Sequence, residues 1–294
     1  MMLVLGGEGQ LGREFARQAA RAGVALVALG RRDADILDRR SIERALAAHK
    51  PSLIVHCAAY TAVDRAESEP EAAQAVNVDG SRIVGESARA ADIPVVHFST
   101  DYVFDGSKTG AYSEDDPVCP LGVYGRTKAE GERALAKAQP RSLILRTSWV
   151  YGVFGANFLK TMLRLARERD ELRVVADQIG SPTSTQAIAL ATLAIAPRLQ
   201  TGPADSLWGV YHLTGSGVTS WHGFAEAIVA AAEPALGRRP KVTAITAVDY
   251  PTPARRPVNS ALDNARFRAA FGITTRAWND DVRETVKLLT NEDA

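Results

Sequence analysis

Tyr124 and Lys128 could perform acid–base chemistry together, because they lie four residues apart in a segment with helical spacing. Side chains at that spacing share one face of a helix. At about 4 Å and an effective dielectric constant near 20, the ammonium would favour the phenolate by about 4 kcal/mol, or about three pKa units. The pair therefore predicts a tuned proton donor, as reduction of a carbonyl requires. Such pairs also arise by chance, so their surroundings decide the interpretation.

Hydroxyl groups end a predicted strand upstream of this pair. Ser99 and Thr100 follow the apolar residues that begin at Val95. Open α/β sheets bind ligands at the carboxyl ends of their strands, so we expect Thr100 to hold a substrate oxygen opposite Tyr124. The alternative is a hydroxyl that only caps local backbone.

A glycine loop follows the first apolar run, with Gly6, Gly9 and Gly12 spaced by three and with Gln10 and Leu11 opening the next helix. A Cβ there would block a tight turn or the approach of a pyrophosphate to the helix N-terminus, where free N–H groups favour anions. The strand before the loop and the helix after it favour a dinucleotide site over a purely structural turn.

Charged residues end the second predicted strand, about twenty residues beyond the glycine loop. Arg31 and Arg32 precede Asp33 at the position where the adenosine ribose is usually read. Arginine pairs with a 2′-phosphate and an acidic residue with a free 2′-hydroxyl, so the two arginines favour NADPH while leaving NADH possible. A solvated charged turn is the structural alternative.

The elements that must position these residues alternate along the first half of the chain. Buried strands are predicted at residues 2–5, 24–29, 53–58, 95–99 and 143–145, and amphipathic helices at 11–22, 41–49, 72–90 and 124–138. This order predicts an α/β fold with a Rossmann-type doubly wound parallel sheet.

A second, smaller substrate-binding lobe is expected after Trp149. Residues 1–150 would form the dinucleotide-binding domain, rejoined by a helix at about 185–196, and residues 151–294 would form mainly the substrate lobe. In that lobe we expect a helix at 158–169, strands at 172–176 and 210–213, and a proline-rich stretch at 250–257.

Composition excludes several other classes of protein. The 294 residues carry 35 Lys and Arg against 34 Asp and Glu, a net charge of +1, which leaves no basic stripe for a nucleic acid. Two cysteines and five histidines show no spacing typical of a disulfide framework or a metal site, so no metal ligands are assigned. The first apolar run is too short for a signal peptide or membrane span, so we expect a cytoplasmic protein without membrane contact.

Several segments together resemble the dTDP-4-dehydrorhamnose reductase family of extended short-chain dehydrogenases. They are residues 6–12, 58–64, 77–78, 99–106, 124–128, 146–152 and 177–183. The resemblance runs nearly end to end and implies NADPH-dependent reduction of the 4-keto group of dTDP-4-dehydro-L-rhamnose to dTDP-L-rhamnose. It also implies that Thr100, Tyr124 and Lys128 form the catalytic trio, with Tyr124 as proton donor.

The same resemblance implies further binding residues. Ala58, Ala59 and Tyr60 would line the cofactor together with Tyr124 and Lys128, whereas the nucleotide sugar would contact Ser99, Thr100, Tyr102, Trp149, Asn157, Arg255 and Arg256. Arg255 and Arg256 lie in a proline-framed loop and could clamp a phosphate.

Some members of the family form dimers around Mg²⁺ held by glutamates. Glu14 could match one such position, but Gln186 stands where a second carboxylate is expected, and an amide is a poorer ligand for that cation. A homodimer and Mg²⁺ are therefore possible expectations only.

Two alternative functions stay open at this point. A nucleotide-sugar epimerase or dehydratase is built on the same cofactor lobe but returns its hydride to the product. A non-catalytic regulatory subunit would bind the dinucleotide alone. The intact Thr100, Tyr124 and Lys128 favour an enzyme over the regulatory subunit.

Overall fold

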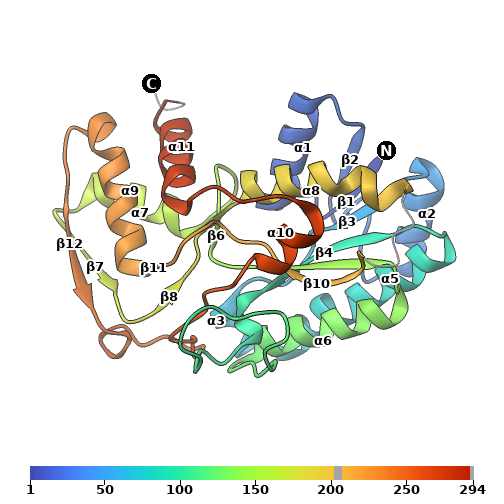
Figure 1. Cartoon of the computed structure of the whole chain (residues 1–294), viewed down its shortest axis with the longest axis horizontal. Coiled ribbons are helices and arrows are strands. Elements are labelled where there is room, and N and C mark those ends of the chain that lie inside the picture. Colours follow the sequence, from blue (N-terminus) through green and yellow to red (C-terminus); the bar gives the residue numbers. More distant parts are fainter. Residues whose placement is uncertain (202–206, 292–294) are drawn as a thin grey trace.

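A six-stranded parallel sheet forms the centre of the larger lobe in the computed structural model, which describes residues 1–201 and 207–291. From one edge to the other the strands are β2 (Leu26–Leu29), β1 (Met2–Leu5), β3 (Leu53–His56), β4 (Val95–Thr100), β5 (Ser142–Thr147) and β10 (Gly209–His212) (Figure 1). Most of these strands are apolar runs buried on both faces, as parallel sheets require. The predicted Rossmann-type fold is confirmed.

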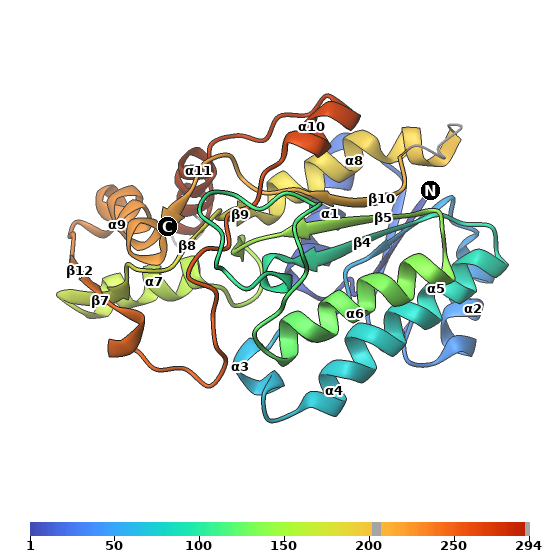
Figure 2. The same cartoon turned by 60° about the horizontal axis from the view of Figure 1, so that its bottom comes forward.

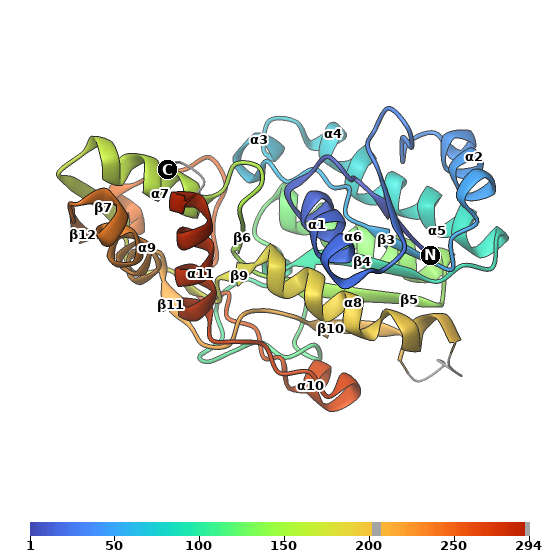
Figure 3. The ribbon, with the colours of Figure 1, turned by 90° about the horizontal axis from the view of Figure 1, so that it is seen from above.

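Two layers of helices cover the sheet. On one face α1 (Gln10–Ala22) packs along α8 (Thr185–Thr201), and their apolar residues share one core with the sheet (Figure 3). On the other face lie α2 (Arg39–His49), α5 (Gly80–Ala90) and α6 (Val123–Ala138), with a second core (Figure 2). The carboxyl ends of the strands between these layers are where ligands of such folds bind.

The helix predicted over residues 72–90 is present but is not uniform. It consists of α4 (Pro70–Gln74), a π-helical turn η1 (Ala75–Asp79) and α5. π-Helical turns often occur at functional sites. This one carries Asn77, which is buried and hydrogen-bonded to the loop that follows β3.

The main sheet also receives segments from the second half of the chain. The strand expected at 210–213 in the second lobe instead pairs with β5, register Val210↔Ile144, and becomes the edge of the main sheet. Helix α10 (Ala265–Phe271) contributes Phe267 and Phe271 to the same core as α1. The strand was misplaced because an apolar pattern does not say which sheet it joins, and β10 covers an edge that β5 would otherwise expose.

The second lobe has a core of its own, separate from the sheet cores. Its helices are α7 (Phe158–Glu168), α9 (Trp221–Leu236) and α11 (Trp278–Asn291), and its largest strand pair is β7 (Glu171–Val175) with β12 (Lys241–Ile245) (Figure 1). Sequence analysis predicted α7 and β7 but neither α9, α11 nor β12. Short pairs β6 (Val150–Tyr151) with β9 (Thr183–Ser184) and β8 (Ile179–Gly180) with β11 (Thr219–Ser220) complete the lobe. Among the described residues, no helix combines the length and apolarity needed to cross a membrane.

Candidate active site

The glycine loop between β1 and α1 needs glycine for close backbone approach. Gly6 has φ +83°, and a Cβ on it would lie 2.6 Å from the backbone nitrogen of Ala58. A Cβ on Gly12 would lie 2.3 Å from the carbonyl oxygen of Gly6. Gly9 is the N-cap of α1 and has no side chain to occupy the free N–H groups of the first turn. The loop therefore fits an anionic pyrophosphate at the helix N-terminus.

Gln10 and Leu11 open α1 beside this loop. Leu11 packs against the core under the sheet, whereas the Gln10 amide oxygen lies 3.4 Å from the Asn157 side-chain nitrogen. Asn157 is also the N-cap of α7, where its Oδ1 accepts from the Lys160 backbone N–H at 3.1 Å. Asn157 thus lies where the second lobe meets the glycine loop, and its role in substrate binding stays a prediction.

A charged pocket of about 600 Å³ adjoins the end of β2. It is lined by Glu8, Arg31, Arg32, Asp35, Asp38, Ser41 and Arg44. Asp33 does not line it: this residue is exposed, and its N–H donates to the Gly30 carbonyl in a turn. Sequence analysis missed Glu8 and Arg44, because only the fold brings the glycine loop and α2 to the end of β2.

Glu8 reaches across the end of β2. A Cβ on Gly30 would lie only 2.5 Å from the Glu8 carboxyl carbon. The pocket therefore combines three arginines with three carboxylates, and the nearest ion pairs, Arg31–Asp35 at 3.3 Å and Arg44–Asp38 at 3.9 Å, are exposed. Such a mixed pocket can meet a phosphate with arginine or a hydroxyl with carboxylate.

The segment Ala58–Ala59–Tyr60 follows β3 and lies against the glycine loop. Tyr60 donates its backbone N–H to Asn77 Oδ1 at 2.9 Å, and the Asn77 amide donates to Tyr60 O at 3.2 Å and Thr127 Oγ1 at 3.0 Å. The Tyr60 hydroxyl donates to Glu69 at 2.6 Å. Asn77 thus joins this segment to the helix that carries Tyr124 and Lys128, a connection that no spacing in the sequence indicates.

Thr100 ends β4 at the carboxyl edge of the sheet. Its hydroxyl donates to Asp101 Oδ1 at 2.9 Å and accepts from the Tyr102 N–H at 3.2 Å. Ser99 is buried, and its hydroxyl makes no hydrogen bond within the part of the chain that the structure describes. The predicted hydroxyls therefore lie at the predicted edge, and Thr100 is the one in a hydrogen-bonded network.

Tyr124 lies in the first turn of α6, beside Thr100. Burial raises the pKa of the phenol to about 12, the Thr100 hydroxyl opposes this increase, and the negative Asp101 adds to it. The rings of Tyr102 and Tyr124 meet edge to face at 5.9 Å. The expected decrease in the Tyr124 pKa is wrong for this structure, because desolvation of the phenolate dominates.

The surroundings of Lys128 also differ from those expected for a partner of the Tyr124 phenol. Lys128 Nζ donates to the Phe98 carbonyl at 2.7 Å and lies 3.2 Å from His97 Nε2, so the ammonium is held against β4. Burial lowers the pKa of Lys128 to about 8, although the charge of Glu132 opposes the decrease. Four-residue spacing places Lys128 on the face of Tyr124 but does not say which atoms take its hydrogen bonds.

Asp101 is a buried carboxyl in the same network, and sequence analysis gave it no role. Burial raises its pKa to about 6, while the nearby hydroxyls of Ser260, Thr100 and Ser148 oppose the increase, and Thr100 donates to Asp101 Oδ1 at 2.9 Å. Its charge is one cause of the raised pKa of Tyr124. Asp101 therefore helps to keep the phenol protonated.

Trp149 lies between β5 and β6, at the junction of the two lobes. Its backbone has φ +46°, and its indole stacks on Trp221 of α9 with ring centroids 3.6 Å apart and planes within 6°. A Cβ on Gly180 would lie 2.5 Å from the Trp149 ring. Positive φ is strained for an aromatic residue, so the second lobe holds this ring in place.

The two arginines of the proline-framed loop have different surroundings. Arg256 binds the Asp64 carboxylate with both terminal nitrogens, at 3.1 and 2.8 Å, whereas Arg255 is exposed. The Ala254 N–H also donates to Asp64, at 3.2 Å. Asp64 belongs to helix α3 (Val63–Ala66), so this ion pair fastens the loop to the segment after β3. Clamping of a phosphate by both arginines stays a prediction.

The Mg²⁺ expectation does not fit the residues present. Glu14 Oε1 accepts from Arg17 at 2.7 Å and from Gln18 at 2.6 Å, so a guanidinium already neutralises this carboxylate. Gln186 donates to Glu284 at 2.8 Å and accepts from Arg17 at 3.2 Å. Over residues 1–201 and 207–291, no cluster of three His, Cys, Asp or Glu side chains could hold a metal ion.

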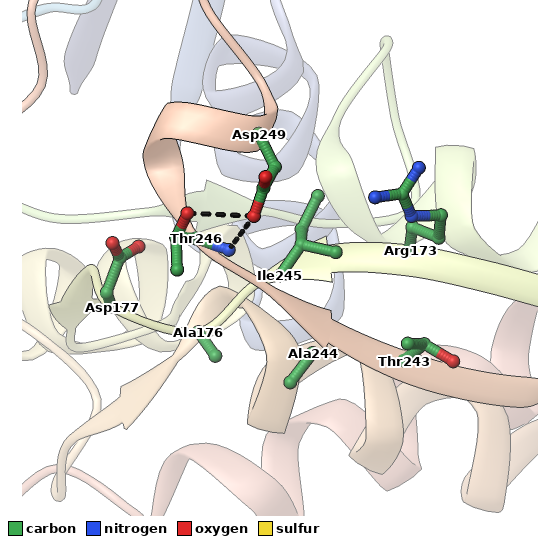
Figure 4. Close-up of a pocket in the computed structure, with 8 residues that line it drawn as sticks. All are labelled: Arg173, Ala176, Asp177, Thr243, Ala244, Ile245, Thr246 and Asp249. Atoms are coloured by element: carbon green, nitrogen blue, oxygen red, sulfur yellow. Dashed lines mark hydrogen bonds between the residues drawn. The ribbon is translucent and has the colours of Figure 1, made fainter.

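A second pocket, of about 570 Å³, lies on the β7–β12 pair (Figure 4). Its two carboxylates stabilise a turn: Asp249 accepts from Thr246, and Asp177 accepts from the Ala247 N–H at 2.9 Å. The turn leads into the proline-rich stretch at 250–257, which contains Arg255 and Arg256. The pocket contains none of the residues predicted for the site. Asp177 stabilises the turn at Ala247 by accepting its N–H.

Comparisons with known proteins agree over nearly the whole length. A family model described as RmlD substrate binding domain matches residues 1–291. The dTDP-4-dehydrorhamnose reductase of Sinorhizobium fredii is 46% identical over 295 residues, 100% of this chain and 99% of that protein. A dTDP-4-dehydrorhamnose reductase from Clostridium acetobutylicum has a similar crystal structure, with TM-score 0.90, 36% identity and coverage of 98% of this chain and 99% of that one. The Bacillus anthracis enzyme in complex with NADP matches with TM-score 0.89, 31% identity and 98% coverage of each chain.

Proposed function

The chain belongs to the dTDP-4-dehydrorhamnose reductase family, and on that premise we propose that it reduces the 4-keto group of dTDP-4-dehydro-L-rhamnose to give dTDP-L-rhamnose. NADPH supplies the hydride when bound. The observation that carries the proposal is that Thr100 and Tyr124 lie together at the carboxyl edge of β4, where Thr100 opposes the rise in the Tyr124 pKa, at the same edge of the sheet as the glycine loop. This arrangement combines a carbonyl-binding hydroxyl, a proton donor and a pyrophosphate cradle.

The chain's own residues divide the work as follows. Thr100 and Tyr124 hold the substrate oxygen, and Tyr124 donates its phenolic proton to that oxygen. With a pKa of about 12, the phenol is protonated throughout the neutral range and therefore carries the proton that it donates. Lys128 holds positive charge beside the reacting oxygen and orients the cofactor. Gly6, Gly9, Gln10, Leu11 and Gly12 receive the pyrophosphate.

The second lobe binds the nucleotide sugar under this proposal. Trp149 packs against the sugar, because its ring is fixed at the lobe junction by Trp221 and Gly180. Ser99 and Tyr102 contact the sugar from the end of β4. Asn157, Arg255 and Arg256 lie toward the nucleotide diphosphate. Within residues 151–201 and 207–291, α8, β10 and α10 pack on the larger lobe instead of the second one.

Turnover with the defined substrate tests this function. Purified protein should oxidise NADPH in the presence of dTDP-4-dehydro-L-rhamnose, one equivalent for each equivalent of dTDP-L-rhamnose formed, and should not oxidise it without the sugar. Absorbance at the reduced nicotinamide band and chromatography of the product measure the two quantities. Conversion of the sugar nucleotide to an isomer without net cofactor oxidation would indicate an epimerase, and folded protein that binds NADPH without turnover would indicate a regulatory subunit.

Cofactor preference depends on Glu8 under the same proposal, and NADH is accepted alongside NADPH. Glu8→Gln should raise the preference for NADPH over NADH by about tenfold, because a carboxylate beside the 2′-phosphate repels it across a partly screened pocket. Arg44→Gln should lower the preference by a similar factor. The ratio of kcat/KM for the two cofactors measures the effect.

Glu43→Gln is the matched control, because Glu43 also belongs to this charged region but is exposed on α2 and does not line the pocket. An unchanged ratio in Glu8→Gln would refute the assignment of selectivity to this residue. A homodimer and a cytoplasmic location are retained as proposals, and light scattering of the purified protein checks the first.

A further inference from the structure

A pair of buried histidines lies behind Lys128. His56 ends β3, His97 lies in β4, and the two are register partners, with ring centroids 4.8 Å apart. His56 is 0% exposed and His97 is 1% exposed. The proposed reaction uses neither ring, and buried histidines inside a parallel sheet require an explanation, because their polar atoms lose water on folding.

His97 contacts the ammonium of Lys128 directly. An ammonium group has three N–H donors. One donates to the Phe98 carbonyl at 2.7 Å, and His97 Nε2 lies 3.2 Å from the same nitrogen. Two rigid acceptors on adjacent residues of one strand therefore fix two of the three N–H bonds. The direction of the third is then determined by tetrahedral geometry.

We infer that His97 is a positioning residue for the reductase reaction: its neutral imidazole accepts a hydrogen bond at Nε2 and so holds the Lys128 ammonium charged and correctly aimed. The inference rests on the proposed function and adds a residue to it. It goes beyond packing, because a leucine or phenylalanine would fill the same space without supplying an acceptor.

The surroundings of His97 support a neutral ring. Burial lowers the pKa of His97 well below its usual value, and the charge on Lys128 lowers it further. Burial and Lys128 likewise lower the pKa of His56 to about 3. A neutral imidazole that accepts at Nε2 carries its proton at Nδ1. The tautomer is therefore fixed by Lys128.

The charges that face Lys128 set the direction of the pH effect. Glu132 on α6 favours the ammonium, and burial opposes the charge. The neutral Cys57 thiol after β3, His97 in β4 and His56 in β3 also face the group. A hydrogen bond to the charged form raises a pKa, so loss of the His97 acceptor lowers the pKa of Lys128 below about 8. Activity that needs the ammonium is then lost at a lower pH.

Four variants test the inference. His97→Leu removes the acceptor, and His97→Asn keeps a polar side chain too short to place its oxygen at the Nε2 position. His97→Gln can place an amide oxygen there. His212→Leu is the matched control, because His212 is a buried histidine in β10 of the same sheet and contacts Tyr112 O rather than Lys128.

The measurements are kcat against pH and the dissociation constant of NADP⁺ against pH, on full-length protein whose folding is checked by thermal unfolding. In His97→Leu and His97→Asn, the alkaline limb of both profiles should move down by about one pH unit, which lowers turnover about tenfold on that limb. His97→Gln should return within about threefold of the native protein, and His212→Leu should keep the native limb.

The inference would be overturned if the alkaline limb of His97→Leu and His97→Asn stayed at the same pH as in the native protein. It would also be overturned if His97→Gln showed the same downward shift as these two variants. The NADP⁺ measurement distinguishes failure of the proposed function from failure of the role inferred for His97. Native protein that binds NADP⁺ but does not reduce the sugar would refute the proposed function, whereas the shift in the binding profile would still test His97.

Discussion

Replacing Tyr124 by Phe is expected to lower turnover by about 10²- to 10⁴-fold while leaving the affinity for NADPH nearly unchanged, because it removes the proton donor and no other group. The phenyl ring keeps the edge-to-face contact with Tyr102 and the volume that α6 packs around. A loss confined to kcat would place the role of the hydroxyl in the transition state.

The pKa values of Tyr124 and Lys128 predict how kcat changes with pH. The phenol of Tyr124 has a pKa raised to about 12, so it stays protonated below that value and limits activity only at strongly alkaline pH. Lys128 has a pKa lowered to about 8, so its charge is present below that pH and is lost above it. The alkaline limb of kcat in the native protein should therefore report Lys128 and not Tyr124.

Steady-state kinetics and fluorescence titration with NADPH measure the two quantities for Tyr124→Phe. Tyr211→Phe is the matched control: Tyr211 lies in the edge strand β10 and packs on Phe271, away from Thr100 and Tyr124. Turnover within threefold of the native rate in Tyr124→Phe would contradict its assignment as proton donor.

Replacing Arg146 by Met is expected to cost about 3–5 kcal/mol of the free energy of unfolding, because it leaves the carboxylate of Glu132 buried without a partner. Arg146 on β5 donates to Glu132 on α6 at 2.9 and 2.7 Å, with both side chains less than a tenth exposed. The guanidinium also lies 5.2 Å from the centre of the Phe104 ring. This pair joins the central sheet to the helix that carries Tyr124 and Lys128.

Urea denaturation of the double variant Arg146→Met/Glu132→Leu separates pairing from packing. It should recover much of the lost stability, because no buried charge is left unpaired. The exposed pair Arg164–Glu168 provides the comparison, where Arg164→Met should cost less than about 1 kcal/mol. A double variant no more stable than Arg146→Met would contradict the electrostatic explanation. The test measures stability and not activity, because Glu132 also raises the pKa of Lys128 and its replacement would change turnover through that residue.

Local sequence was sufficient for the parts of the site that depend on spacing and backbone shape. The glycine loop leaves no space for a side chain at Gly6 or Gly12. Three glycines between a predicted strand and a predicted helix indicate this requirement in the sequence. Thr100 lies at a strand end because the apolar run stops there. Alternating strand and helix patterns predicted the parallel sheet, since each pattern is set by residues within one element.

Local sequence did not indicate how distant segments complete the site. The charged pocket joins Glu8 to Arg44, the loop ion pair joins Asp64 to Arg256, and β10 joins the main sheet after a long excursion through the second lobe. Each contact links residues from different elements, and periodicity within one element carries no information about its neighbours.

The sequence by itself determined a dinucleotide-binding α/β fold with Thr100, Tyr124 and Lys128 at its ligand edge, because spacing and turn chemistry are local properties. Only the tertiary structure decided the ionisation of these groups. Burial raises the pKa of Tyr124, and β4 supplies the Phe98 carbonyl and His97 as partners for Lys128, where the sequence alone had predicted a phenol tuned by the neighbouring ammonium. The physical reason is that a pKa depends on solvation and on every charge and hydrogen bond around the group, most of which come from other elements of the fold.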